Sequence, residues 1–134
     1  MVSAALRLSV LVTAAVSVLA APAPIPGCLK EYTVQAGDWC DKISQFEGIP
    51  TYQLAKVNEG IIDEGCTNIF PGQVICLAKE GLDCHLISQV DHDNTCADIV
   101  AATGVTLEKL LQNNPNIDAE CTNIYEGEVL CVEP

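Results

Sequence analysis

The chain has 134 residues, of which eight are cysteine, and aromatic residues make up 4% of it. Eighteen acidic residues stand against six basic ones, which gives a formal net charge of -12. Nucleic acids and anionic membrane surfaces are themselves negative and are bound through clusters of lysine and arginine, so this charge excludes both as partners. The length suits one ordinary domain or two small ones.

The N-terminal residues 1–20 are predicted to be a signal peptide. Arg7 is followed by an uncharged run of about 14 residues, shorter than the roughly 20 that cross a bilayer as a helix. This run ends in the small or modest side chains Val18, Leu19 and Ala20, which suit a signal peptidase. Residues 21–27 follow as a proline-rich spacer. The sequence therefore predicts a secreted protein.

The cysteines fall into two sets of four with nearly equal spacing. The gaps are 12, 26 and 10 residues in the first set and 12, 25 and 10 in the second. Residues 66–76 (CTNIFPGQVIC) also align with residues 121–131 (CTNIYEGEVLC), which indicates a duplication. We predict a module over residues 28–78, a short linker over residues 79–83 and a second module over residues 84–134.

An even number of cysteines in a secreted chain predicts disulfides, which stabilise modules of about 50 residues that bury little surface. Four cysteines allow three pairings in each module. If the ends of a module pair as antiparallel strands, the outer two cysteines lie close together, as do the inner two. This favours the pairs Cys28–Cys76, Cys40–Cys66, Cys84–Cys131 and Cys96–Cys121.

Zinc is the alternative use of these cysteines, because His85 follows Cys84 and His92 lies near Cys96. The first repeat has no histidine at either matching position. A metal site would therefore not be shared by the repeat. We predict no metal and no other cofactor, with both histidines at the surface.

The first repeat begins with alternating polar and apolar side chains over residues 31–35, which predict a short strand. Asp38 is a suitable N-cap for a helix that contains Ile43 and Phe46 on one face. Gly48 is expected to end this helix.

The rest of the first repeat predicts a second helix and a second strand. Pro50 prevents continuation of the first helix, and Thr51 can cap a helix that contains Leu54 and Val57. A loop follows over residues 58–65, and the last strand covers residues 74–77.

The second repeat gives the same order of elements. A strand is predicted over residues 86–90, and Asn94 or Thr95 caps a helix that Gly104 ends. Thr106 caps the next helix, which contains Leu107, Leu110 and Leu111; a loop over residues 113–116 and a strand over residues 129–132 complete the repeat. The predicted fold class is α+β, with two tandem modules in the order strand, helix, helix, strand.

Several segments resemble the LysM domain. Residues 32–39 (YTVQAGDW) are similar to its opening, a Tyr-x-Val strand followed by Gly-Asp-Thr. Residues 68–73 (NIFPGQ) match the approach to its last strand, and residues 114–117 (NPNI) resemble its second loop. With a signal peptide and four cysteines in each module, the whole chain resembles a secreted fungal LysM effector.

This resemblance implies recognition of chitin and other N-acetylglucosamine oligomers. In the family, two loops grip the sugar: one after the first strand and one between the second helix and the last strand. Asp93 stands where the family often has glycine, and the first repeat has one extra residue in its second loop. The implied ligand-binding residues are Gly37, Asp38, Trp39, Glu59, Gly60, Ile61 and Ile62 in the first module, and Asp93, Asn94, Thr95, Pro115, Asn116 and Ile117 in the second.

Two of these assignments leave alternatives open. Trp39 either stacks on a sugar face or covers the small core beside Tyr32. Ile61, Ile62 and Ile117 are either ligand contacts or core residues. Two modules on one chain could hold a single oligomer or cross-link separate chains, which includes a ligand-induced dimer.

We predict that the protein is not an enzyme. A glycoside hydrolase needs two carboxylates at a defined separation in a cleft, whereas the acidic residues here are scattered along small repeats. By resemblance, the expected role is to sequester chitin fragments from host immune receptors or to shield the fungal wall from chitinases. The alternative is a disulfide-stapled protein ligand or inhibitor that binds no carbohydrate.

Overall fold

The computed structural model describes residues 12–17 and 19–134. Most of the predicted signal peptide, residues 1–11 and 18, lies outside the described residues. Among the described residues, no helix has both the length and the apolar character needed to cross a membrane.

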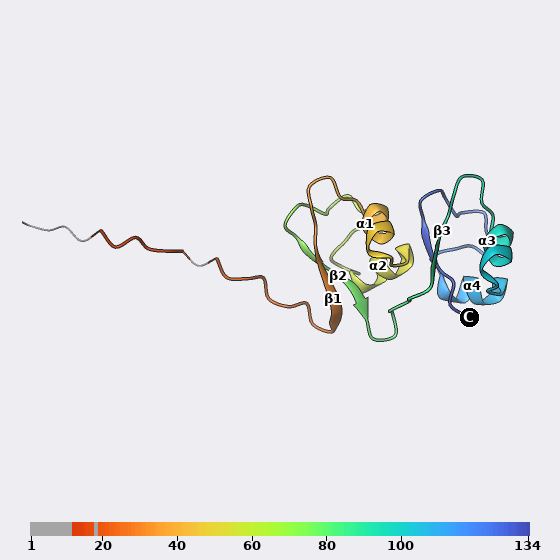
Figure 1. The fold of residues 1–134 in the computed structure, drawn as a ribbon, viewed down its shortest axis with the longest axis horizontal. Coiled ribbons are helices and arrows are strands. Elements are labelled where there is room, and N and C mark those ends of the chain that lie inside the picture. Colours follow the sequence, from red (N-terminus) through yellow and green to blue (C-terminus); the bar gives the residue numbers. More distant parts are fainter. Residues whose placement is uncertain (1–11, 18) are drawn as a thin grey trace, which may run out of the picture.

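Module 1, residues 28–78, contains two helices that lie between two strands in chain order. Its elements are β1 (Cys28–Thr33), α1 (Cys40–Glu47), α2 (Thr51–Val57) and β2 (Val74–Lys79). β1 and β2 pair antiparallel, with Tyr32 opposite Ile75 (Figure 1). The first strand therefore begins three residues earlier than the alternation of side chains predicted, because its pairing with β2 continues to Cys28.

Module 2, residues 84–134, repeats this order with shorter strands. Its elements are β3 (Ile87–Gln89), α3 (Cys96–Thr103), α4 (Leu107–Asn113) and β4 (Val129–Cys131). β3 and β4 also pair antiparallel, with Ser88 opposite Leu130. The predicted α+β fold with two strand, helix, helix, strand modules is confirmed.

The helix starts correct two of the sequence predictions. α1 has Trp39 at its N-cap and α2 has Pro50, and neither makes a side-chain cap hydrogen bond. Asp38 does not cap α1 because its carboxylate is held by other groups, and Thr51 is already the first residue of α2.

In module 2 the predicted caps are present. Thr95 forms a reciprocal capping box with Asp98, and Thr106 accepts a hydrogen bond from the backbone N–H of Lys109. The predicted ends of α1 and α3 are also confirmed. Gly48 and Gly104 have φ angles of 68° and 77°, a left-handed conformation that glycine adopts without a steric cost.

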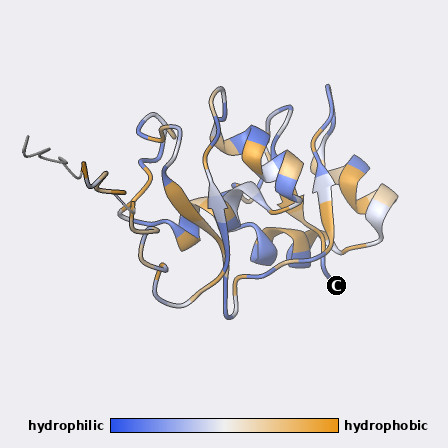
Figure 2. Ribbon diagram, turned by 60° about the vertical axis from the view of Figure 1, so that its left-hand side comes forward, coloured by the Kyte–Doolittle hydropathy of each residue, from blue (hydrophilic) through white to orange (hydrophobic). Residues whose placement is uncertain are grey.

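Each module has its own small core, stapled by two disulfides. Ile43, Leu54 and Ile75 are central to the core of module 1, and Ile99, Leu110 and Leu130 to that of module 2. Figure 2 shows hydrophobic and hydrophilic residues side by side along the helices, as expected where one helix face packs inward. The predicted disulfides are confirmed: Cys28–Cys76, Cys40–Cys66, Cys84–Cys131 and Cys96–Cys121.

The two modules are docked in a head-to-tail order. Figure 1 shows α1 and α2 between the sheet of module 1 and the sheet of module 2, with α3 and α4 on the far side. The Gln45 side-chain amide donates to the carbonyl of Gly127 at 2.7 Å, and Gln53 accepts from the backbone N–H of Cys84 at 2.9 Å. The helices of module 1 therefore pack on the outer side of the sheet of module 2.

Candidate functional site

The turn between β1 and α1 is held by Asp38. Its carboxylate accepts hydrogen bonds from the Tyr32 hydroxyl at 2.7 Å and from the backbone N–H of Gln35 at 2.8 Å, and Lys42 lies 3.1 Å away. The hydrogen bond from Tyr32 is the main reason that the pKa of Asp38 lies below its usual range. The same bond raises the pKa of Tyr32 to about 12. Asp38 therefore fixes the loop and has little capacity left for a ligand.

Trp39 projects from this turn into solvent. It is 56% exposed and is not part of the core of module 1. The ammonium of Lys42 lies 5.4 Å from the centre of the indole ring, within the range of a cation–π contact. Trp39 therefore does not cover the core of module 1, which was one of the two roles considered for it.

The corresponding turn of module 2 has the same backbone with different side chains. Asp93 occupies the place of Gly37, and the two residues have φ angles of 62° and 82°. This position requires a positive φ, which aspartate tolerates better than most residues. Asn94 and Thr95 replace Asp38 and Trp39. The Thr95 hydroxyl is used by the capping box of α3.

The loop between α2 and β2 differs from its counterpart by one inserted residue. Glu59 forms a 2.6 Å ion pair with Lys56, and Gly60 takes a φ of 80°. Ile61 is 42% exposed, whereas Ile62 packs against the core. The loop of module 1 therefore exposes Glu59, Gly60 and Ile61 between the buried Asn58 and the half-buried Ile62.

The loop between α4 and β4 is tighter. Ile117 is 7% exposed and belongs to the core of module 2, so it offers a ligand little contact area. The Asn116 side-chain amide donates to Glu128 at 2.6 Å, and Pro115 is exposed. Glu128 is itself buried, and its second carboxylate oxygen has no hydrogen-bond partner among the described residues. Burial raises the pKa of Glu128.

Two buried asparagines fix these loops, a role that was not predicted from the sequence. The Asn58 side chain donates to the carbonyls of Leu54 and Cys76 and accepts from the N–H of Cys76. Asn114 makes the same three hydrogen bonds, to Leu110 and Cys131. Both lie at the equivalent place in the repeat, 18 and 17 residues before the last cysteine, and this repetition was the signal that could have found them.

A shallow hollow lies in each module beside the disulfide that joins the second loop to the first turn of the first helix. The module 1 hollow, about 160 Å³, is lined by residues that include Asp41, Thr51 and Ala55, and by Tyr125 of module 2. The module 2 hollow, about 460 Å³, is lined by Thr95, Ala97, Val100, Leu107 and Ala119 beside Cys96, Glu120 and Cys121. Equivalent surfaces are thus covered in one module and open in the other.

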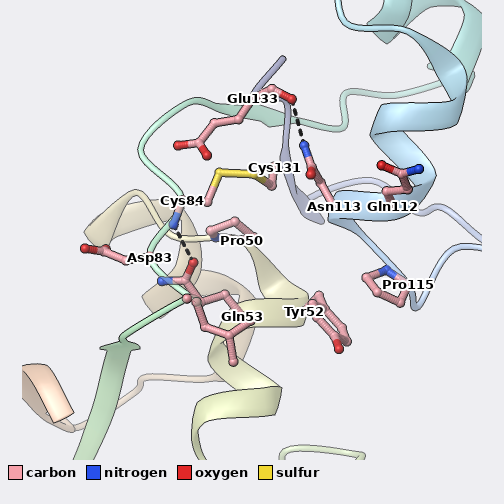
Figure 3. Close-up of a pocket in the computed structure, with 12 residues that line it drawn as sticks. Pro50, Tyr52, Gln53, Asp83, Cys84, Gln112, Asn113, Pro115, Cys131 and Glu133 are labelled. Atoms are coloured by element: carbon pink, nitrogen blue, oxygen red, sulfur yellow. Dashed lines mark hydrogen bonds between the residues drawn. A yellow bond between two sulfur atoms is a disulfide. The ribbon is translucent and has the colours of Figure 1, made fainter. Parts of the chain in front are cut away.

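A cleft lined by residues of both modules lies at their junction (Figure 3). It has a volume of about 500 Å³. Tyr52 and Pro115 approach it from the two modules, and the Cys84–Cys131 disulfide forms part of its wall. The Asn113 amide donates to the carbonyl of Glu133 at 2.8 Å at its rim.

The predicted ligand-binding residues are distributed over these features. Glu59, Gly60 and Ile62 line a hollow beside Tyr52 and Lys56, Thr95 lines the module 2 hollow, and Pro115 lines the junction cleft. The structure places the remaining predicted residues on the loops, outside the hollows described: Gly37, Asp38, Trp39, Ile61, Asp93, Asn94, Asn116 and Ile117.

The described residues contain one cluster with metal-ligating side chains, Cys84, Cys131 and Glu133. The two cysteines are joined to each other, so their sulfur atoms are not available as thiolate ligands. His85 and His92 lie at the surface, with side chains 75% and 79% exposed.

Comparison with known proteins agrees with this architecture. The LysM domain family matches residues 32–78 and 89–133. A secreted LysM effector of Pochonia chlamydosporia is 31% identical over 120 residues, which cover 88% of this chain and 17% of that protein. A secreted LysM effector of Trichophyton rubrum is 27% identical over 140 residues, which cover 84% of this chain and 55% of that protein.

A non-secreted relative is also similar. A non-secreted LysM effector of Penicillium expansum is 37% identical over 108 residues, 77% of this chain and 8% of that protein. Among solved structures, the spore cortex-lytic enzyme SleL of Bacillus megaterium has a TM-score of 0.40 and 18% identity, over 78% of this chain and 22% of that one. The chain spans only part of the length of each of these proteins. LysM domains bind carbohydrates such as chitin, and this chain belongs to the LysM domain family, with two LysM modules.

Proposed function

We propose that the protein binds chitin or chitooligosaccharides without cleaving them. The observation that carries the proposal is the presence of two complete LysM modules, each with loops fixed by a disulfide and a buried asparagine. N-acetylglucosamine oligomers are neutral and rich in amides, so they suit loop backbone groups and small apolar surfaces. The net charge of -12 is no obstacle to a neutral ligand.

In this proposal the two loops of each module hold the sugar. In module 1, Trp39 stacks on a sugar face, which fits its 56% exposure, while Gly37 and Asp38 shape the turn and Glu59 to Ile62 form the opposite wall. In module 2, the ligand contacts come from Asp93, Asn94 and Thr95 in the first loop and from Pro115 and Asn116 in the second, while the buried Ile117 supports the second loop. The modules differ in side chains at nearly every one of these positions, so their affinities should differ as well.

We further propose that the protein is secreted, with residues 1–20 as the signal peptide, and acts as a fungal effector. Four disulfides fit an oxidising compartment, and two of the relatives described above are named secreted effectors. The proposed role is to sequester chitin fragments from host receptors or to shield the wall from chitinases. Chitinase digestion of fungal walls with and without the protein separates the two, because only shielding slows sugar release from intact walls.

Calorimetric titration of the oxidised protein tests the binding. We expect saturable heat with a hexamer of N-acetylglucosamine and none with a cellulose hexamer, which lacks the acetamido groups. The stoichiometry will say whether the modules share one oligomer. Folded protein that gives no heat and no competition with either sugar would contradict the proposal and favour the stapled protein ligand.

Three alanine variants locate the site. Trp39→Ala should weaken binding about tenfold if the indole stacks on the sugar. Asn94→Ala probes the first loop of module 2. Phe46→Ala is the matched control, because Phe46 is 81% exposed on α1 and lies outside both loops. Equal affinities of all three variants and the wild type would place the sugar elsewhere.

A further inference from the structure

The module 1 hollow lies between the two loops that hold the sugar in the proposed function. Cys40 and Asp41, which line it, directly follow Trp39 at the end of the first loop. Ile62, a predicted ligand-binding residue of the second loop, also lines it. The module 2 hollow has the same place in its module, because Thr95 of its first loop lines it. A sugar held by both loops of a module therefore borders the hollow of that module.

A residue of module 2 covers the module 1 hollow. Tyr125, in the turn before β4, lines this hollow from the neighbouring module, and its hydroxyl donates to Asp41 at 3.0 Å. The volume that remains is about 160 Å³, against about 460 Å³ in module 2. The residues that line the module 2 hollow all belong to module 2 itself. The docking of the modules therefore reduces one hollow and leaves the other open.

The cover is held by positions at which the two repeats differ. Asp41 accepts from the Tyr125 hydroxyl, and Thr51 accepts from the backbone N–H of Val129 at 3.0 Å. Their counterparts in module 2 are Ala97 and Leu107, which have no side-chain oxygen to accept a hydrogen bond. These two polar groups of the module 1 hollow are therefore used to hold module 2.

Other contacts keep Tyr125 near the hollow when its ring moves away. The Gln45 amide donates to the carbonyl of Gly127, and Gln53 accepts from the backbone N–H of Cys84, both outside the hollow. A tethered group of this kind competes with a dissolved ligand at an effective concentration of about the millimolar range. The ring is 46% exposed, so it can leave the hollow without opening a hydrophobic core.

We propose that Tyr125 closes the sugar site of module 1, so that sugar fills the open module 2 first and enters module 1 only when the ring has moved out. This inference rests on the proposed function, because it takes the loops of each module as the sugar site. A site that is open for a fraction of the time binds with an affinity reduced by that fraction. Tyr125 therefore sets the order in which the two modules are filled.

Trp39 provides a signal for module 1 alone. It is the only tryptophan of the chain, and it directly precedes Cys40 in the lining of the module 1 hollow. Titration of the oxidised protein with a hexamer of N-acetylglucosamine can be followed by calorimetry, which records both modules, and by Trp39 fluorescence. In the wild type, we expect most of the heat to appear at lower sugar concentrations than the change in Trp39 fluorescence.

Variants of Tyr125 should bring the two signals together. Tyr125→Ala removes the cover, so the Trp39 transition should move to an about tenfold lower sugar concentration. Tyr125→Phe removes only the hydroxyl that donates to Asp41, so a shift of about two- to fivefold is expected. The heat released by module 2 should appear at the same sugar concentration in every variant.

Phe70→Ala is the matched control. Phe70 occupies the position of Tyr125 in the first repeat, in the turn before β2, and its side chain is 59% exposed. It is not among the residues that line the hollows. Removing it should therefore leave both the heat and the Trp39 transition as in the wild type. Circular dichroism of each variant checks that it is folded.

The direction of the shift decides the result. Weaker binding at module 1 in Tyr125→Ala would show that the ring contacts the sugar instead of excluding it, and would overturn the proposal. A folded Tyr125→Ala whose Trp39 transition is absent or unchanged would overturn it as well. Either result with heat still released leaves the proposed chitin binding intact, whereas the absence of heat in all variants and the wild type rejects chitin binding itself.

Discussion

The two modules share one scaffold and differ in what surrounds it. Asn58 and Asn114 make the same hydrogen bonds, and the inner disulfides Cys40–Cys66 and Cys96–Cys121 join the same elements. Yet the module 1 hollow is covered by Tyr125, while its counterpart in module 2 is open. The comparison teaches that the two repeats keep the same groups to hold their loops. The side chains that line the hollow differ between the repeats, and so does what packs against the hollow.

Removing an inner disulfide should have the largest effect. The bridges span 26 residues in module 1 and 25 in module 2, so replacing either pair with alanine should cost about 3–4 kcal/mol of unfolding free energy. Urea unfolding followed by circular dichroism measures this loss. A much smaller loss in one module would mean that the two scaffolds are not equivalent.

Asn58→Ala and Asn114→Ala should come next, at about 2–3 kcal/mol each, because each leaves buried backbone groups without partners. Chemical denaturation compares the two variants. Asn94→Ala is the control, since the structure gives this side chain no hydrogen bond among the described residues. If one of the two variants unfolds with the same free energy as the wild type, water must satisfy the backbone groups that the asparagine bonded in that module.

Glu128 tests a difference between the modules, because module 1 has Gln73 at the same position. The pKa of Glu128 in the folded protein is raised above the ordinary pKa of a glutamate. The free energy of unfolding therefore falls as the pH rises from the ordinary pKa through the raised one, because the buried carboxylate becomes charged. Glu128→Gln should therefore stabilise the protein by about 1 kcal/mol at neutral pH.

The stability gained by Glu128→Gln should disappear at a pH below the ordinary pKa of a carboxyl group, because the glutamate is then neutral in both the folded and the unfolded chain. Thermal unfolding at pH 7 and at about pH 3.5 measures the difference. The converse change, Gln73→Glu, should destabilise at neutral pH. A gain that does not vary with pH would show that packing rather than charge is responsible.

The smallest expected effect is at the docked aromatic residue. Tyr125→Phe removes the hydrogen bond to Asp41 and should cost about 0.5–1 kcal/mol, because the ring is 46% exposed. Burial and the charge of Asp41 raise the pKa of the Tyr125 hydroxyl, so it stays protonated and donates through neutral pH. Phe70→Tyr should leave monomer stability unchanged. Urea unfolding at low protein concentration compares the two.

The sequence by itself determined the architecture of each module. The cysteine spacing predicted the duplication, and glycines at 48 and 104 ended the first helices as expected. The spacing left three pairings open in each module, and the expected antiparallel pairing of the module ends favoured the four disulfides that the structure has. These features are local or are set by the repeat, so they can be read from spacing and from the conformational preferences of single residues. The LysM pattern likewise lies in contiguous segments and was predicted from them.

Only the tertiary structure decided which of the predicted site residues are exposed and free to contact a ligand. Asp38 looked like a helix cap, but the Tyr32 hydroxyl, six residues away in the sequence, holds its carboxylate. Ile117 is placed in the core, and Trp39 outside it. The cover over the module 1 hollow comes from Tyr125, whose partner Asp41 is 84 residues away. Spacing within a repeat carries no information about the contact between Tyr125 and Asp41, because it depends on how one module packs on the other.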